Sequence, residues 1–179
     1  MKKIVALLLI VLFTSSSCEK DDICDANTPT TPRVVIEFFN ISNPSVLKNV
    51  TDLKVIGDGM TEGIVFNTSE TGDKKYLANG SKIMIPLKTD LNSTTYQFIL
   101  NSTNSNPTLI DIDEVTFNYT RNDVYVSRAC GFKTLFTFDP INSFTQTAIP
   151  ATKQKWMQYI SVEKSNIANE NETHIKVFF

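Results

Sequence analysis

Apolar and polar side chains alternate along short runs of this sequence, and this period of two favours β-strands over any other element. The period of an amphipathic helix, with apolar residues at i, i+3 and i+4, is nearly absent. The alternating apolar positions are Val34, Ile36 and Phe38; Val115, Phe117 and Tyr119; Phe132, Phe136 and Phe138, with Thr134 between them; and Ile175, Val177 and Phe179. The pattern predicts an all-β fold.

Residues that favour turns separate these runs. Asn79-Gly80 lies between the strand-like segments 74–78 and 81–87. It predicts a β-hairpin with a type I′ turn, because both central residues of that turn need positive φ. Gly131 lies between two further strand-like runs, as a bulge or a tight corner requires.

The rest of the pattern sets the number of strands. Residues 121–123 are expected to separate two strands, and residues 140–154 form the longest stretch with no strand pattern. Eight or nine strands result, at spacings typical of two packed sheets. We therefore expect residues 33–179 to form a single antiparallel β-sandwich. Segments 36–59 and 81–100 resemble immunoglobulin-like and transthyretin-like domains of bacterial surface lipoproteins in their strand layout.

The first 17 residues have the features of a secretory signal. A basic start at Lys2 and Lys3 precedes ten apolar residues, 4–13, and then small residues up to Ser17. Ten apolar residues are too few to cross a bilayer as a helix, which needs about twenty. We therefore predict that residues 1–17 are removed and take no part in the fold.

Cys18 follows directly after three serines, where a lipoprotein signal peptidase needs the cysteine that accepts the lipid. The stretch resembles a bacterial lipobox in the relaxed form found in Bacteroidetes. We expect Cys18 to be lipidated and residues 18–32 to form a tether to the outer membrane. Lys20, Asp21 and Asp22 resemble the export signal that sends such lipoproteins to the cell surface. A short charged run is also typical of a solvated tether, and the alternative is a domain that faces the periplasm.

Lipidation of Cys18 leaves Cys24 and Cys130 as an even pair in an oxidising compartment. A disulfide between them would close a loop of about a hundred residues and stabilise the chain by about 4–5 kcal/mol. The alternative is two free thiols, with Cys130 buried in the core.

No convincing catalytic set is evident. His174 is the only histidine, and its place in the alternation predicts a position on the solvent face of an edge or terminal strand. Asp111 and Asp113 share one face of an expected strand and could act as the paired carboxylates of a glycosidase. The alternative is a structural role, because acidic residues at the start of a strand commonly cap it and keep it soluble. The sequence shows no paired spacing of metal ligands, so we expect no metal and no cofactor.

Arg121, Asp123 and Arg128 form a further candidate group. In the alternation, Arg128 falls on the same face as the apolar residues Val124 and Val126, so it is expected to be buried. A buried arginine needs a carboxylate or carbonyl partner. The group predicts a structural ion pair beside Cys130, or an arginine that grips a ligand.

Three segments resemble an uncharacterised lipoprotein family of Flavobacteria and other Bacteroidetes, a domain of unknown function. They are DDIC with TPTTPRVVIEF within residues 21–38, DVYVSRACGFKTLF at 123–136, and NENETHIKVFF at 169–179. The resemblance implies pairing of Cys24 with Cys130 and implies no active site.

These features together predict a non-enzymatic binding or structural module, anchored in the membrane by lipid, with a glycan or another envelope protein as candidate partner. A carboxylate-dependent hydrolase, such as a glycosidase, is the alternative. From Cys18 onwards the chain would carry 15 basic and 19 acidic side chains, since Lys2 and Lys3 are the charged residues of the leader. This mild acidity argues against a nucleic-acid partner.

Overall fold

The computed structural model describes residues 23–28 and 30–179, and these form two compact units. The sandwich unit comprises residues 31–123 and 134–179. The hairpin-tip unit comprises the described residues of 23–30 together with 124–133.

The first sheet of the sandwich unit has five strands, in the order β10-β12-β1-β2, with β5 also paired to β1. The strands are β1 (Val34–Asn40), β2 (Asn43–Leu47), β5 (Lys82–Ile85), β10 (Tyr159–Val162) and β12 (Ile175–Phe178). Strands β1 and β12 are parallel, and the other pairs are antiparallel.

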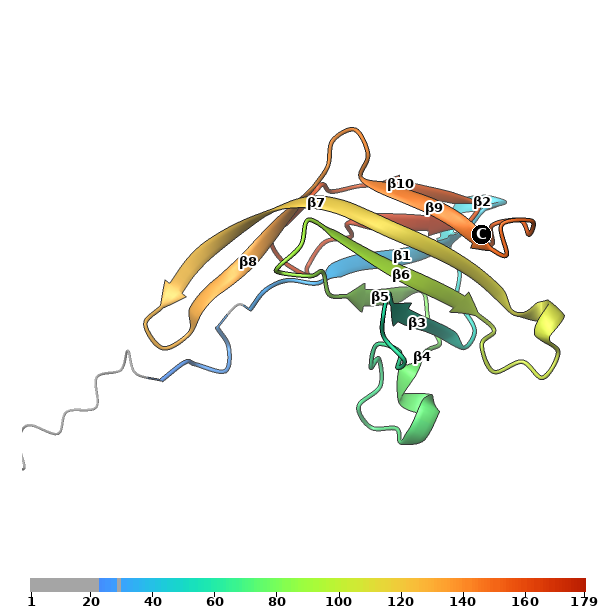
Figure 1. Cartoon of the computed structure of the whole chain (residues 1–179), viewed down its shortest axis with the longest axis horizontal. Helices are drawn as coiled ribbons and strands as arrows, with labels where there is room; N and C mark the ends of the chain where they lie inside the picture. Colours follow the sequence, from blue (N-terminus) through green and yellow to red (C-terminus); the bar gives the residue numbers. More distant parts are fainter. Residues whose placement is uncertain (1–22, 29) are drawn as a thin grey trace, which may run out of the picture. The chain divides into compact units, whose positions relative to one another are not determined.

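The second sheet has seven strands, in the order β11-β8-β7-β6-β3-β4, with β9 also paired to β7 (Figure 1). They are β3 (Leu53–Gly57), β4 (Leu77–Ala78), β6 (Ser93–Leu100), β7 (Asp111–Ser127), β8 (Gly131–Phe138), β9 (Phe144–Ile149) and β11 (Asn166–Ile167). Two short 3₁₀ helices, η2 (Gly72–Tyr76) and η3 (Pro107–Leu109), lie in the connections.

The core lies between the two sheets and follows the alternation of the sequence. Phe38 of the first sheet and Phe98 and Phe117 of the second are almost wholly buried. Burial of each such side chain contributes about 1.5–3 kcal/mol. The predicted β-sandwich is therefore confirmed, with twelve strands in the described residues instead of eight or nine.

The hairpin predicted at Asn79-Gly80 is wrong. Strand β4 before this turn pairs with β3 in the second sheet, whereas β5 after it pairs with β1 in the first. The segment therefore crosses between the sheets, and Gly80 does not take the positive φ of a type I′ turn. Tertiary pairing has overridden a strong local turn signal.

The boundaries around β7 also differ from those expected. Residues 121–123 do not interrupt the strand, because β7 continues to Ser127 and turns at residues 128–130. Gly131 follows this turn with φ of 69°, which confirms the tight corner. Residues 144–149, expected to lack a strand, form β9 against β7. This strand was not predicted because one of its faces is open to solvent and carries polar side chains.

Within the described residues, no helix is long and apolar enough to cross a membrane.

Candidate binding groove of the sandwich unit

A groove of about 870 Å³ lies where the chain crosses from β4 to β5. These two strands belong to different sheets, and each pairs with a single neighbour among the described strands. Leu77 and Ala78 of β4 line one wall, and Ile83 and Met84 of β5 line another. The groove therefore lies between two open strand edges.

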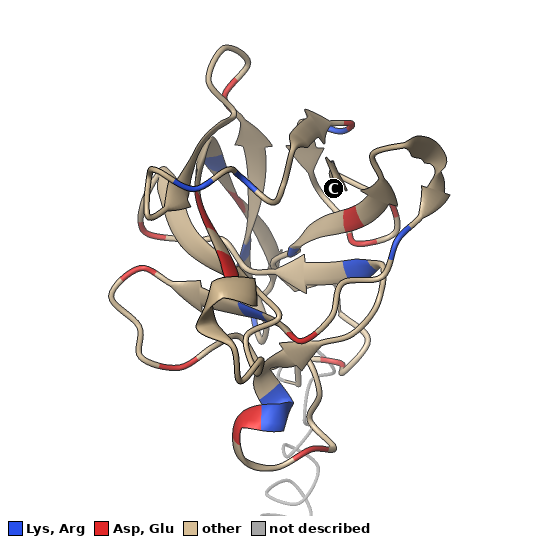
Figure 2. Ribbon diagram, turned by 90° about the vertical axis from the view of Figure 1, so that its right-hand side faces the viewer, with Lys and Arg blue, Asp and Glu red and all other residues tan. Residues whose placement is uncertain are grey.

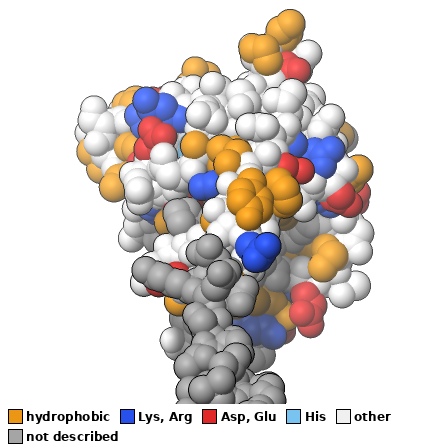
Figure 3. Space-filling model, turned by 90° about the vertical axis from the view of Figure 1, so that its left-hand side faces the viewer, with side chains coloured by type: hydrophobic (Ala, Val, Ile, Leu, Met, Phe, Trp, Pro, Cys, Tyr) orange, Lys and Arg blue, Asp and Glu red, His pale blue; other side chains and the backbone are white. Residues whose placement is uncertain are grey.

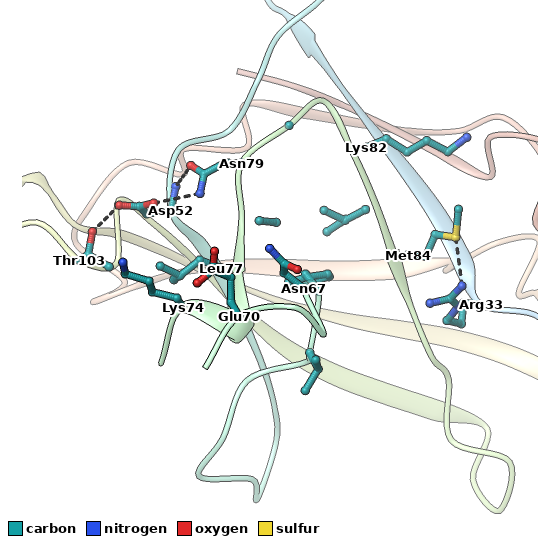
Figure 4. Close-up of a pocket in the computed structure, with 15 residues that line it drawn as sticks. Arg33, Asp52, Asn67, Glu70, Lys74, Leu77, Asn79, Lys82, Met84 and Thr103 are labelled. Atoms are coloured by element: carbon teal, nitrogen blue, oxygen red, sulfur yellow. Dashed lines mark hydrogen bonds between the residues drawn. The ribbon is translucent and has the colours of Figure 1, made fainter. Parts of the chain in front are cut away.

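The groove has polar residues at both ends, and Asn67 and Glu70 lie among the apolar side chains between them (Figure 4). Val65 and Phe66 add to the apolar lining. At one end, the Asp52 backbone N–H donates to Asn79 Oδ1 at 2.8 Å, and Asn79 Nδ2 donates back to Asp52 Oδ1 at 3.1 Å. Thr103 Oγ1 donates to the other carboxylate oxygen of Asp52. This closed network fixes the crossover at the strand edge.

Arg33 lies at the opposite end, beside Met84 (Figure 4). Its guanidinium donates to both carboxylate oxygens of Glu170 at 2.8 Å. The hydrogen bond to Glu170 raises the pKa of Arg33, and the same bond lowers the pKa of Glu170. Arg33 is thus held in place, as bidentate carboxylate pairing favours.

The outer edge of β5 presents backbone groups towards the groove side. The Phe38 N–H donates to the Ser81 carbonyl at 2.8 Å, which places Ser81 in a hydrogen-bonded pair with β1. Because such pairs alternate along an antiparallel ladder, Ile83 and Ile85 also bond to β1. The N–H and C=O groups of Lys82 and Met84 then point away from β1. This edge can accept a further strand.

Charges near the groove are mixed in sign. Lys74, Lys82 and Glu70 line it in exposed positions, and Lys82 Nζ lies 3.8 Å from Glu37. Positive and negative residues are interspersed over the ribbon (Figure 2). The groove therefore does not select strongly for a charged ligand.

Asp111 and Asp113 are on one face of β7, as predicted, but in different surroundings. Asp113 is 0% exposed, and its Oδ2 accepts from the Met157 N–H and from Gln146 Nε2, each at 2.9 Å. Burial raises the pKa of Asp113, and these hydrogen bonds oppose that shift. Asp111 is half-buried and pairs with Lys153 at 2.7 Å. Neither carboxylate lines the groove.

His174 is not on the solvent face, so that prediction is wrong. Its side chain is 0% exposed, and Nδ1 accepts from the Val35 N–H at 2.9 Å. Strand β12 lies between β1 and β10, so it is an interior strand of its sheet. Burial lowers the pKa of His174 and keeps the ring neutral. The imidazole takes the place of a backbone acceptor where β1 begins to pair with β12.

Arg121, Asp123 and Arg128 do not form the expected ion pair; none of them has a salt-bridge partner within residues 30–179. Arg121 donates from Nε to Asn92 Oδ1 at 2.9 Å and from Nη1 to the Thr89 carbonyl. Asp123 accepts from Thr134 Oγ1 at 2.7 Å.

Arg128 is exposed in the turn of the hairpin-tip unit, so the expectation of a buried arginine is wrong. The parity argument failed because β7 ends at Ser127, one residue before Arg128.

Cys24 and Cys130 are joined by a disulfide, with an S–S distance of 2.02 Å and Cα atoms 5.0 Å apart. Cys18, Lys20, Asp21 and Asp22 lie outside the described residues. The described part of the chain holds no cluster of three or more His, Cys, Asp or Glu residues that could bind a metal.

Sequence reasoning missed the groove. Its lining comes from segments between residues 33 and 103 that are far apart in the chain. The available signal was the Asn79-Gly80 pair, which we interpreted as a local hairpin. The proline at 86, just after β5, was a second signal, because it limits how far that strand can pair.

Comparison with protein families gives a match over residues 52–179 to a family described as a family of unknown function (DUF6452). The match covers most of the sandwich unit and includes the β7–β8 hairpin. No curated protein and no solved structure matches the chain.

Proposed function

The chain belongs to DUF6452, a family of unknown function, and we propose that it is a non-enzymatic, lipid-anchored envelope protein. Its sandwich unit would bind an extended segment of another envelope protein along the edge of β5. The observation that carries the binding proposal is the open edge of β5 beside a groove of about 870 Å³ whose lining combines apolar side chains, such as Val65 and Leu77, with polar ones.

The anchoring proposal is supported by the first 24 residues. The apolar run at 4–13, the serines before Cys18, and the charged residues Lys20, Asp21 and Asp22 form the pattern of a Bacteroidetes surface lipoprotein. Two or more acyl chains on Cys18 would hold the chain stably on a membrane, whereas one chain binds only marginally. The disulfide between Cys24 and Cys130 agrees with an oxidising compartment.

Strand addition fits the groove better than glycan binding does. An added strand gains backbone hydrogen bonds from an open edge and places alternate side chains in adjacent pockets. Lys82 and Met84 offer such backbone groups, and Val65, Phe66 and Leu77 offer an apolar surface. A sugar ring is usually held by exposed aromatic faces, and Phe66 is the aromatic residue of the lining.

The hydrolase alternative rests on Asp113, because it is the desolvated carboxylate of the predicted pair. However, Asp113 binds the backbone of Met157 and lies outside the groove, and Asp111 is neutralised by Lys153. A glycosidase needs both carboxyls at the substrate. These surroundings favour a structural role for both residues.

Three measurements test the anchoring and the surface display. Mass spectrometry of the N-terminal peptide should show acylated Cys18, and Cys18→Ala should release the protein from the membrane fraction. Protease added to intact cells should cleave the protein if it is displayed on the surface. Replacement of Lys20, Asp21 and Asp22 by alanine should confine cleavage to permeabilised cells. An unmodified Cys18 would contradict the anchoring proposal.

The binding proposal is tested with a photo-reactive amino acid at Met84. We expect one discrete cross-linked partner, whose attached segment, made as a peptide, binds the purified protein. Met84→Pro removes an outward N–H and should weaken that binding at least about tenfold, while the hydrogen bonds from Ile83 and Ile85 to β1 remain. The matched control places the cross-linker at Ile141, an exposed side chain outside the groove. Equal cross-linking at both positions would disprove a specific site.

A further inference from the structure

The hairpin-tip unit exposes large apolar side chains to solvent. Ile23 is 74% exposed, Tyr125 is 59% exposed and Phe132 is 68% exposed. Hydrophobic side chains gather beside Lys and Arg side chains on the face viewed from the end where β7 and β8 meet (Figure 3). An exposed group of this kind usually marks a surface that another body covers.

The exposed rings have a fixed arrangement. Tyr125 of β7 and Phe132 of β8 lie edge to face, with ring centroids 5.4 Å apart. The turn between them is held by a hydrogen bond from the Cys130 N–H to Ser127 Oγ at 3.1 Å. The two aromatic side chains therefore form one contiguous apolar pair near the end of a hairpin.

The hairpin part of the unit is basic, whereas the stretch that leads to it from Cys18 is acidic, with Glu19, Asp21, Asp22 and Asp25 against Lys20. The described residues of the unit include two basic side chains, Arg128 and Lys133, and one acidic side chain, Asp25. Basic residues close to a membrane are attracted by anionic lipids over roughly one Debye length, about 10 Å. Basic residues beside aromatic rings are typical of protein segments that lie in the membrane interface.

The disulfide limits how far the tip can be from the proposed lipid anchor. Cys130, in the turn of the hairpin, is bonded to Cys24. Cys24 is six residues from Cys18. Six residues span at most about 20 Å when fully extended. If Cys18 carries the lipid, the hairpin is confined to the immediate neighbourhood of the bilayer surface.

We propose that Tyr125, Phe132 and Ile23 insert into the interfacial layer of the membrane leaflet that holds the lipid anchor. The tip then acts as a second attachment point beside the acylated Cys18. This inference rests on the lipidation in the proposed function, because the short reach from Cys18 is what selects a membrane over other occupants. Tyr is suited to this layer since its ring is apolar and its hydroxyl is polar.

The first experiment uses the lipidated chain in vesicles of phosphatidylethanolamine and phosphatidylglycerol. A Phe132→Trp variant should show a blue-shifted indole emission and strong quenching by brominated lipid. Trp156, which is buried in the sandwich unit, supplies the background and is measured alone in the unchanged chain. An introduced indole that stays fully hydrated and unquenched overturns the proposal.

The second experiment uses the chain from Cys18 onwards with Cys18→Ala, which has no lipid. Tyr125→Ser with Phe132→Ser should lower its partition into the same vesicles about tenfold or more, since two aromatic side chains lose their burial. Ile141→Ser, which removes an 87% exposed apolar side chain from the sandwich unit, is the matched control and should change partition little. An equal loss in both variants overturns a specific role for the tip.

The two proposals fail in different ways. If mass spectrometry finds no acyl group on Cys18, the anchoring proposal falls, whatever the vesicle result. If Cys18 is acylated and the indole of the Phe132→Trp variant stays in water, the tip inference alone falls. A blue shift that appears without vesicles and grows with protein concentration would show that a second copy covers the tip, which also overturns membrane insertion.

Discussion

At the scale of single residues, His174 supports the pairing of β1 with β12. The Val35 N–H points towards β12 but meets the imidazole Nδ1 instead of a carbonyl, while the His174 N–H donates to the Val35 carbonyl at 3.0 Å. Nε2 is buried and has no hydrogen-bond partner in the described part of the chain. The acceptor role of Nδ1 requires a neutral ring, and burial favours that state.

We predict that His174 makes the stability depend on pH near neutrality. Burial lowers its pKa in the folded state, although Glu170 and Glu172 oppose this shift. The unfolded chain therefore binds more protons, and stability falls as the pH drops below about 6.5, by at most about 1.4 kcal/mol per unit. Urea unfolding between pH 5.5 and 7.5 measures the slope.

His174→Asn is the matched variant. Its Oδ1 can accept from the Val35 N–H as Nδ1 does, but the side chain does not titrate. The slope in this pH range should flatten, even if the free energy of unfolding at pH 7.5 is lower. An unchanged slope would show that another group is responsible.

At the scale of elements, Asp113 attaches the connection between β9 and β10 to the middle of the second sheet. Its Oδ2 binds the backbone of Met157 in that connection and the side chain of Gln146 in β9. Trp156 adds a hydrogen bond from Nε1 to the Phe98 carbonyl at 3.1 Å. A segment with little secondary structure is thus held in the core by polar contacts.

We predict that Asp113→Ala lowers the free energy of unfolding by about 2–4 kcal/mol, because it leaves the buried Met157 N–H without an acceptor. Asp113→Asn should lower it less, since the amide oxygen can still accept and no charge is buried. Amide hydrogen exchange at Met157 should accelerate in the alanine variant and change little in the asparagine variant. Similar exchange in both variants would refute the proposed attachment.

At the scale of the whole molecule, the disulfide joins cysteines 106 residues apart in the sequence. The loop that it closes contains most of the strands of both sheets. A cross-link over so long a loop restricts the unfolded chain strongly, which is the main source of its stabilising effect in the chain-entropy account.

We predict that Cys24→Ser with Cys130→Ser lowers the free energy of unfolding by about 2–5 kcal/mol. Urea unfolding measures this loss in the chain from Cys18 onwards. The control is Cys18→Ser, which leaves the disulfide intact and should not change the stability. A double variant as stable as the control would mean that the loop adds nothing.

The local alternation of residues was enough to predict the fold class and much of the core. Val34, Ile36 and Phe38, and likewise Val115 and Phe117, are buried as their period of two requires. The side chains of a strand must alternate between two faces whatever its neighbours are, so this information is local. The assignment of Cys18 to the lipid left Cys24 and Cys130 either as a disulfide or as two free thiols, and the structure joins them.

Other features depended on which strands become neighbours. His174 has the parity of a solvent-facing residue but is buried, because β12 lies inside its sheet between β1 and β10. Arg128 has the parity of a core residue but is exposed in a turn. Parity assigns a side chain to one face of a sheet and carries no information about what covers that face.

The sequence was therefore enough to predict a β-sandwich and the inward faces of strands such as those of Phe38 and Phe117, but not all of the strands, since β9 was missed. Tertiary structure alone decided that Asn79-Gly80 crosses between sheets, that the edge of β5 lies open beside a groove, and that Asp113 and His174 are buried. The physical reason is that strand propensity and alternation are properties of neighbouring residues. A groove, an open edge and a desolvated side chain arise only when segments distant in the sequence pack together.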